Sequence, residues 1–410
     1  MNIWLVQTGE SIPLDGNVRK IRTAVLADEL TRRGHTVLWW ASAFDHFSKK
    51  WISSGETEVA LGRNLKVIAL KGAGYKRNVS LQRVIDHRII AGKFRSLAPK
   101  APAPDVVVAS LPSHDLAYEA VLFARKKGIP VVVDIRDPWP DIFLNHVPLP
   151  LRGIVKMLLH KDFLMAREAI RKADGLLAVS DTFMDWGLRY AARQKTPRDK
   201  VFYLGYKREP QGPSIGARVS DAINRSSGKF VVLFVGTLAN YHDPSIVAEC
   251  AKRLAGTDIV FIIAGEGEFF ESVRRKTNGM PNIFLTGWVN QDEITALLRH
   301  SRIGICPTAE EVDLFPNKAF AYLSAGLPVV SAFEGDIKRL IDAYKIGLYY
   351  APNNSVALAG CIKKLYDDQS LYKEMSDNAV KIFEERFDAA KICRDYAEYI
   401  ERLVTDGRRN

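Results

Sequence analysis

The chain has 410 residues, of which 47% are hydrophobic and 26% charged, with four cysteines and a formal net charge of +11. This length suits two domains of ordinary size, and the composition excludes a disordered, collagen-like or disulfide-rich chain. No apolar run reaches the roughly 18 residues of a membrane-spanning helix, and the first residues lack a signal-peptide pattern, so we expect a cytoplasmic protein.

The excess positive charge belongs to the first half of the chain. Residues 1–205 carry a net charge of +12 and the remainder −1. Such asymmetry indicates an anionic partner such as a membrane surface or a lipid diphosphate, although plain solubility charge also explains it. The patterns of RNA-binding, helix-turn-helix and OB domains are missing, so no nucleic-acid partner is expected. The cysteines lack metal-binding spacing, which predicts free thiols and no metal site.

The chain begins with the pattern of a doubly wound α/β domain. A buried strand over 2–8 leads through a loop over 9–17 into a helix over 18–33, which Gly34 ends, and a strand over 36–40 follows. Ligands of this fold class bind at the carboxyl ends of the strands. The G-x-G-x-x-G pattern is absent there, so a dinucleotide cofactor is not indicated. Arg19 and Arg22 share one helix face, either as ligand-binding residues or as ordinary surface arginines.

Two later strands, over 105–109 and 130–134, run into polar loops that should meet at one sheet edge. His114 lies in the first of these loops, where a histidine can contact a sugar hydroxyl or transfer a proton, although a surface histidine is equally compatible. Asp137 lies in the second loop. It can form a local ion pair with Arg136, but we favour a role in the ligand cleft that we expect at this sheet edge.

The segment 148–172 combines a broad apolar face with flanking basic residues. This pattern is typical of a long crossover helix packed on the sheet, which is the interpretation we favour. A basic amphipathic helix can also lie in a membrane interface, and the two roles are compatible at the start of the helix.

A polar stretch over 209–228, with several Pro and Gly residues, marks a domain boundary. Beyond it, strands are expected over 230–235, 258–264, 282–286 and 302–306, each with a Gly or Pro at its carboxyl end. The stretch 313–331 then predicts a loop, a helix ended by Gly326 and a short strand. Lys318 at the start of that helix makes a natural anion site, although a solvated lysine on an ordinary crossover is also possible. From 353 onward the pattern is helical.

The stretch 313–331 resembles the donor-site signature of family 4 glycosyltransferases, especially the bacterial O-antigen and capsule branch. That signature has two acidic residues eight positions apart, a Pro-Asn-Lys core and a closing Gly-x-Pro. Asp313 stands at the first acidic position, where Glu is usual, and Ala321 replaces the second, which in the family holds the ribose. The loop after residue 235 also lacks the Arg and Lys that usually bind the diphosphate there, with His242 as a weak substitute.

The resemblance implies an α/β protein of the GT-B fold, with two Rossmann-like doubly wound domains facing a cleft. The acceptor domain would span 1–208, the donor domain 209–386, and a C-terminal helix over 387–410 would pack back on the first domain. The implied activity is retaining transfer of a sugar from a nucleotide sugar, taken as a UDP-sugar, to a lipid-linked or surface-polysaccharide acceptor. No metal or other cofactor is required, and the first domain is expected to contact an anionic membrane surface.

The same resemblance assigns the site residues. The implied catalytic residues are Asp313, His114 and Asp137, and Gly16, Arg19 and Arg22 would face the acceptor or phosphate. The donor-binding residues would be Gly236, Thr237, Gly265, Glu266, Gly267, Trp288, Val289, Phe315, Pro316, Asn317 and Lys318. Two alternatives remain, a sugar-nucleotide epimerase of the same fold and a two-domain solute-binding protein.

Overall fold

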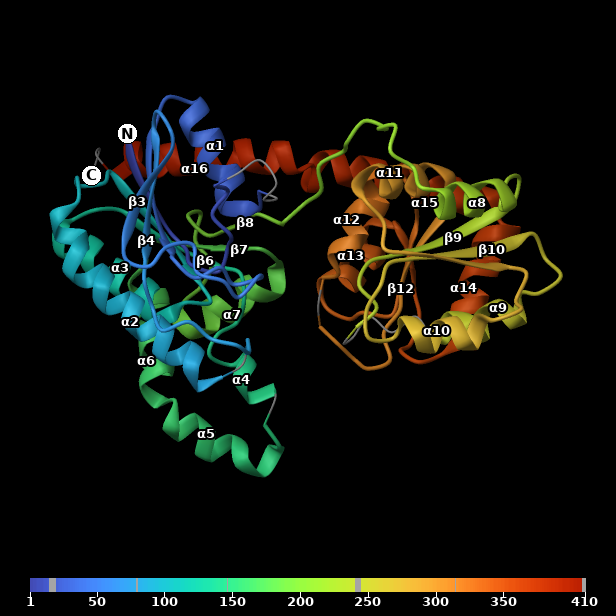
Figure 1. The fold of residues 1–410 in the computed structure, drawn as a ribbon, viewed down its shortest axis with the longest axis horizontal. Coiled ribbons are helices and arrows are strands. Elements are labelled where there is room, and N and C mark those ends of the chain that lie inside the picture. Colours follow the sequence, from blue (N-terminus) through green and yellow to red (C-terminus); the bar gives the residue numbers. More distant parts are fainter. Residues whose placement is uncertain (15–19, 79, 146, 240–244, 314, 408–410) are drawn as a thin grey trace. The chain divides into compact units, whose positions relative to one another are not determined.

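The computed structural model describes the chain except residues 15–19, 79, 146, 240–244, 314 and 408–410. It divides into two compact units (Figure 1). The first unit comprises Met1–Tyr203 with Cys393–Asn410, and the second comprises Leu204–Ile392. The sequence prediction placed the two divisions at 208 and 387, so each observed division lies within six residues of the predicted one.

The first unit is built on an eight-stranded sheet of order β3-β4-β2-β1-β5-β6-β7-β8. Only β3 runs antiparallel to its neighbour in this sheet. β5 and β6 are buried along their whole length, which is why they read as continuous apolar runs. The strands are β1 (Asn2–Val6), β2 (Thr36–Ser42), β3 (Thr57–Gly62), β4 (Leu65–Leu70), β5 (Val106–Leu111), β6 (Val131–Ile135), β7 (Gly175–Ala178) and β8 (Lys200–Val201).

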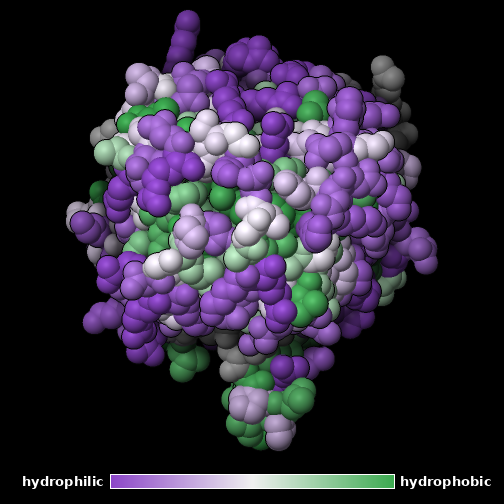
Figure 2. Space-filling view, turned by 90° about the vertical axis from the view of Figure 1, so that its right-hand side faces the viewer, coloured by the Kyte–Doolittle hydropathy of each residue, from purple (hydrophilic) through white to green (hydrophobic). Residues whose placement is uncertain are grey.

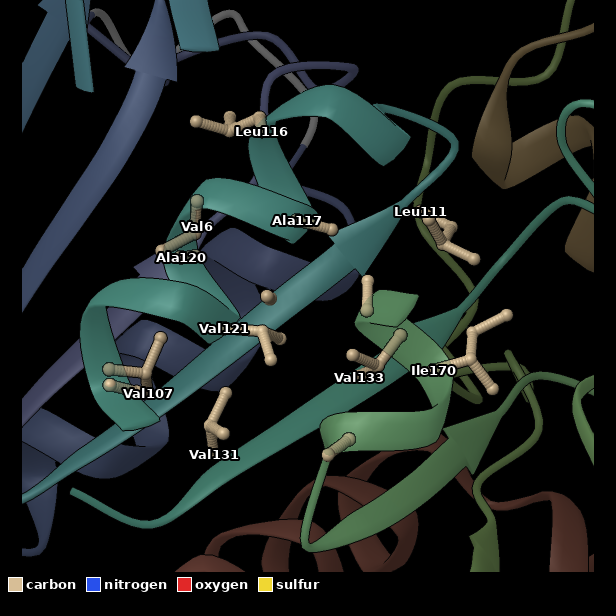
Figure 3. Packing of buried hydrophobic residues seen from close by; sticks show 14 of the residues in the cluster. Val6, Val107, Leu111, Leu116, Ala117, Ala120, Val121, Val131, Val133 and Ile170 are labelled. Carbon is tan, nitrogen blue, oxygen red and sulfur yellow. The ribbon is translucent and has the colours of Figure 1, made fainter. Parts of the chain in front are cut away.

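Helices cover both faces of this sheet. Figure 3 shows one face, where α3 lays Ala117, Ala120 and Val121 against Val107 and Val131. The small alanines let the helix approach the sheet closely. On the other face, the C-terminal helix contributes Tyr396, Ala397 and Ile400 to a second core. The helices of the first unit are α1 (Arg22–Arg32), α2 (Leu81–Leu97), α3 (His114–Lys127), α4 (Ile142–Asn145), α5 (Arg152–Leu158), α6 (His160–Lys172), α7 (Asp181–Ala191) and, from Cys393 on, α16 (Ala389–Gly407).

The second unit contains a parallel six-stranded sheet of order β11-β10-β9-β12-β13-β14. This order reverses direction between β9 and β12, the point where open α/β sheets bind ligands. The strands are β9 (Phe230–Val235), β10 (Ile259–Ala264), β11 (Ile283–Gly287), β12 (Ile303–Cys306), β13 (Val329–Ser331) and β14 (Gly347–Tyr349). The helices are α8 (Ala217–Arg225), α9 (Ser245–Arg253), α10 (Phe270–Thr277), α11 (Gln291–His300), α12 (Asn317–Ser324), α13 (Asp336–Tyr344), α14 (Ser355–Asp367) and α15 (Gln369–Ile382).

Three sequence expectations differ from the structure. The segment 148–172 is not one long helix: it comprises a 3-10 turn at Leu149–Leu151, α5 and α6, with a break at Leu159, and no residue of α5 is buried. The first helix begins at Arg22 and not at 18, and the last strand of the first unit, which the sequence predicts over 201–204, comprises only Lys200–Val201. In the part of the chain that the structure describes, no helix is long and apolar enough to cross a membrane.

Candidate functional site

The predicted donor loops come together at the carboxyl edge of the second sheet. The loop after β10 packs directly on the loop after β9: the Leu238 N–H donates to the Glu266 carbonyl at 3.0 Å, and the Gly265 N–H donates to the Gly287 carbonyl at 2.7 Å. Gly265 has a φ of +140°, and a Cβ there would collide with the Gly236 carbonyl. The glycines at these strand ends therefore allow three loops to pack closely at one edge of the sheet.

Lys318 lies near the point where the strand order of this sheet reverses, between β9 and β12. Its Nζ sits 3.9 Å from the centre of the Phe234 ring, which belongs to β9, and next to Gly236 at the end of that strand. The ammonium is buried and has no hydrogen-bond partner among the described residues. Burial lowers the pKa of Lys318 to about 8. A buried ammonium that lies over an aromatic face and has no hydrogen-bond partner among the described residues is a group arranged to receive an anion.

The helix that carries Lys318 is fixed to the sheet by Tyr322. The Tyr322 hydroxyl accepts from the Val235 N–H at 3.0 Å and lies 3.3 Å from the Ile305 carbonyl, so it bridges β9 and β12. Gly304 allows this close approach, because a Cβ there would overlap the Tyr322 ring. The sequence analysis did not single out Tyr322. The structure shows that it positions the start of α12.

The remaining predicted donor residues lie in the loops, and at the start of α12, at the same edge of the sheet. Pro316 immediately precedes α12, and Phe315 packs on Phe320 with ring centres 4.3 Å apart. Trp288 is 65% exposed, whereas Val289 is buried. Exposed surface is also present on Thr237, Glu266, Gly267 and Asn317.

Asp313 lies close to the start of α13. Its backbone bridges to Glu334, and its carboxylate lies against Gly335, which has a φ of +72° and no room for a Cβ. Gly335 precedes the first residue of α13, so the carboxylate stands near the positive end of that helix. The predicted role of Asp313 in holding the donor sugar stays a prediction.

The corresponding edge of the first unit holds an ion-pair network that the sequence analysis did not foresee. Arg22 contacts both oxygens of the fully buried Asp134 at 3.1 and 3.2 Å, and Arg136 contacts the same carboxylate at 2.9 Å. Arg136 also pairs with Glu10, which accepts from the Thr23 N–H near the start of α1. Burial alone would raise the pKa of Asp134, but the two guanidinium groups outweigh it and lower that pKa.

This network bears on the predicted phosphate-side residues. The guanidinium of Arg22 is engaged by Asp134 and by the Phe202 carbonyl at 2.7 Å, so its observed contacts lie within the first unit. Gly16, Arg19 and His242 lie outside the described residues. The sequence offers no signal for the network, because Arg22 and Glu10 are more than 100 residues away from Asp134 and Arg136 and meet them only through the fold.

His114 is buried at the start of α3 instead of lying on a surface loop. Its Nε2 stands 3.0 Å from Asp162 and 3.6 Å from Asp115, and Arg88 also contacts Asp162 at 3.1 Å. His114 Nδ1 has no partner among the described residues. The ligand atoms of these three acidic and imidazole groups lie within 4.8 Å of one another, so they form the one group among the described residues that could hold a metal ion.

Asp137 follows β6, and burial raises its pKa to about 6 against the opposing effect of Arg83 and Arg136. Arg83 covers the ring of Trp139 at 4.3 Å, so the Arg-Asp-x-Trp-Pro loop is held by a cationic group from α2. A carboxyl group with a pKa near 6 is able to exchange a proton at neutral pH. The predicted catalytic roles of His114 and Asp137 remain untested by this geometry.

These features define a protein of the GT-B class: two units with parallel sheets, a buried lysine where the strand order of the second sheet reverses, and a C-terminal helix α16 that belongs to the first unit. Residues 229–368 match the family described as glycosyl transferases group 1, and residues 20–206 match the glycosyl transferase 4-like domain. The chain therefore belongs to the family 4 glycosyltransferases, and it is an enzyme of that class.

Individual relatives agree with this assignment. The alpha-D-kanosaminyltransferase of Streptomyces kanamyceticus is 24% identical over 276 residues, which cover 65% of this chain and 69% of the relative. The O-antigen chain mannosyltransferase C of Escherichia coli is 22% identical over 317 residues, covering 71% and 84%. Among solved structures, HepE of Anabaena in complex with UDP has a TM-score of 0.67 at 16% identity and covers 98% of this chain and 100% of its own.

Proposed function

We propose that this glycosyltransferase moves a sugar from a UDP-sugar to a lipid-linked or surface-polysaccharide acceptor, with retention of the anomeric configuration. The observation that carries the donor half of the proposal is the buried ammonium of Lys318 beside Gly236. Structural relatives support the choice of nucleotide, since HepE has been solved with UDP and with UDP-glucose.

Transfer from a nucleotide sugar requires a site that stabilises the departing diphosphate. The Lys318 ammonium and the first amide groups of α12 would meet the diphosphate oxygens, which would give the ammonium the hydrogen-bond partner that it lacks among the described residues. Because negative charge grows on the diphosphate as the bond to the sugar breaks, a buried cation stabilises the transition state more than the bound substrate. The exposed ring of Trp288 offers a surface on which the base can stack.

Asp313 would hold hydroxyl groups of the donor sugar, and His114 and Asp137 would act on the acceptor side. His114 Nε2 faces Asp162, whereas Nδ1 has no hydrogen-bond partner in the part of the chain that the structure describes. Asp137 has a pKa near 6, which suits the exchange of a proton with an acceptor hydroxyl. With retention, the new bond forms on the face of the sugar that the diphosphate leaves.

The acceptor half of the proposal rests on the charge of the first half of the chain and on the relatives. The net +12 over residues 1–205 favours a lipid diphosphate at an anionic membrane surface. The O-antigen chain mannosyltransferase C supports a surface-polysaccharide acceptor. The protein would accordingly act in the cytoplasm as a peripheral membrane enzyme.

The test is a transfer assay with radiolabelled UDP-sugars and a lipid-diphosphate-linked sugar as acceptor. Label should pass from the aqueous into the organic phase, and the new linkage should keep the anomeric configuration of the donor by NMR. EDTA should leave the rate unchanged, because we propose that no metal is required. An inverted linkage, or transfer only after divalent cations are restored, would contradict the proposal on those points.

A further inference from the structure

Five apolar residues of the segment 149–158 are exposed. Leu149, Met157 and Leu158 are 76%, 70% and 73% exposed, and Leu151 and Ile154 are about half exposed. We call these five residues the apolar projection. α5 projects away from the body of the first unit (Figure 1), and Figure 2 shows the hydrophobic projection at its lower edge. A large group of exposed apolar residues on a protein surface usually marks a site of contact with a partner or a membrane.

A neighbouring helix extends the exposed apolar surface. Leu81, Ile85 and Ile89 of α2 are all exposed and recur every four residues, so they share one face of that helix. α2 touches α6 through the contact of Arg88 with Asp162, and Leu164 on α6 is also exposed. The exposed apolar residues therefore come from three adjoining helices of the same unit.

The charges around the apolar projection are of one sign. Between residues 147 and 167, the basic residues Arg152, Lys156, Lys161 and Arg167 retain exposed surface. Asp162, the acidic residue of this stretch, is buried and paired with Arg88 and His114. An apolar tip with a basic rim is complementary to an anionic bilayer. A second copy is a poorer occupant, because a symmetric contact would bring two basic rims together.

We propose that the apolar projection inserts into the interface of an anionic lipid bilayer, with the basic residues around it on the lipid headgroups. The proposal rests on the proposed function for its purpose, since it brings the first unit to a lipid-linked acceptor. Insertion adds to charge attraction a component that salt does not screen, because burial of apolar surface does not depend on the Debye length.

The pair Asp162–His114 fixes the helix α6, which follows the apolar projection in the chain. Asp162 lies in the first turn of α6, two residues after that helix begins, and it joins α6 to α2 and α3 through Arg88 and His114. Leu159, at the break between α5 and α6, packs with Trp139 and Phe143. α5 is therefore held at its inner end, while its own residues remain exposed.

The experiment is flotation of the full-length protein with phosphatidylglycerol–phosphatidylcholine vesicles at about 0.1 M and 0.5 M salt. The higher salt concentration shortens the Debye length and so weakens the attraction between the basic residues and the lipid headgroups. The wild type should float at low salt and retain a bound fraction at high salt. The variant Met157→Asp/Leu158→Asp should lose about tenfold or more in lipid affinity and the whole salt-resistant fraction. Lys156→Gln/Lys161→Gln should lose low-salt binding and keep the salt-resistant fraction.

The control is Ile215→Asp/Val356→Asp, which adds the same charge at two exposed apolar residues of the second unit and should float like the wild type. Equal flotation of the Met157/Leu158 variant and the wild type would overturn the proposal, as would no flotation at either salt concentration. A solution dimer that the Met157/Leu158 variant dissociates, without lipid binding, would assign the surface to a second copy instead. UDP binding by calorimetry is measured on every variant, so loss of membrane binding is distinguished from failure of the proposed transferase function.

Discussion

Lys318→Met should raise the stability of the folded protein and weaken its binding of UDP. Methionine is only one atom shorter than lysine and carries no charge. Burial lowers the pKa of Lys318 from 10.5 to about 8, and each pKa unit corresponds to about 1.4 kcal/mol. The charged lysine therefore costs the folded state about 3 kcal/mol relative to the unfolded chain. Because the folded pKa lies below the unfolded value, this cost is fully present below pH 8 and disappears as the pH rises through 10.5.

At pH 7 the free energy of unfolding of the ligand-free second unit should thus rise by up to about 3 kcal/mol in Lys318→Met. The affinity for UDP should fall by about 1.5–3 kcal/mol, the range for a hydrogen bond to a charged group. Urea unfolding followed by circular dichroism measures the first quantity, and titration calorimetry measures the second.

The control is Lys364→Met, which removes an exposed lysine from α14 and should change neither quantity. A Lys318→Met protein that is less stable than the wild type would mean that the ammonium already has a partner in the folded chain. Unchanged UDP affinity would remove Lys318 from the donor site. Either result would refute the reasoning.

Three further outcomes follow from the same geometry. UDP affinity should fall as the pH rises above 8, by no more than the loss caused by Lys318→Met, because only protonated Lys318 attracts the diphosphate; a flat calorimetric profile from pH 7 to 10 would contradict this. Asp313→Asn should reduce turnover far more than it weakens UDP binding, and equal losses would make the carboxylate structural. Asp134→Asn should lower the free energy of unfolding by about 3–5 kcal/mol, because Arg22 and Arg136 would lose their buried partner; the exposed Asp28→Asn is the matched control for that urea measurement.

The sequence predicted those elements whose apolar pattern matches their burial. The strands of both sheets that end at Gly, Pro or a polar loop were found because buried parallel strands read as continuous apolar runs. α2 escaped prediction for the opposite reason. Its first half buries Arg83, Asp86 and His87 and exposes Leu81 and Ile85, so the usual polar pattern is reversed there and periodicity does not reveal the helix.

The candidate site shows the same division between local and long-range information. The Lys318 signature is contiguous and was readable as an anion site, but only the fold shows that the ammonium is buried over Phe234 without a hydrogen-bond partner among the described residues. The network of Arg22, Asp134 and Arg136 depends on strands that are distant in sequence. The exposed state of α5 was also beyond prediction, because an amphipathic run looks alike on a sheet and in a membrane interface.

The central claim is that the second unit binds the diphosphate of a UDP-sugar at Lys318. Thermal unfolding of the wild type with UDP, GDP, dTDP and uridine tests it most directly, since a ligand that binds only the folded state raises the melting temperature. The account predicts a clear rise with UDP and little with uridine, which lacks the diphosphate. No rise with any nucleoside diphosphate, or an equal rise with uridine and UDP, would contradict it.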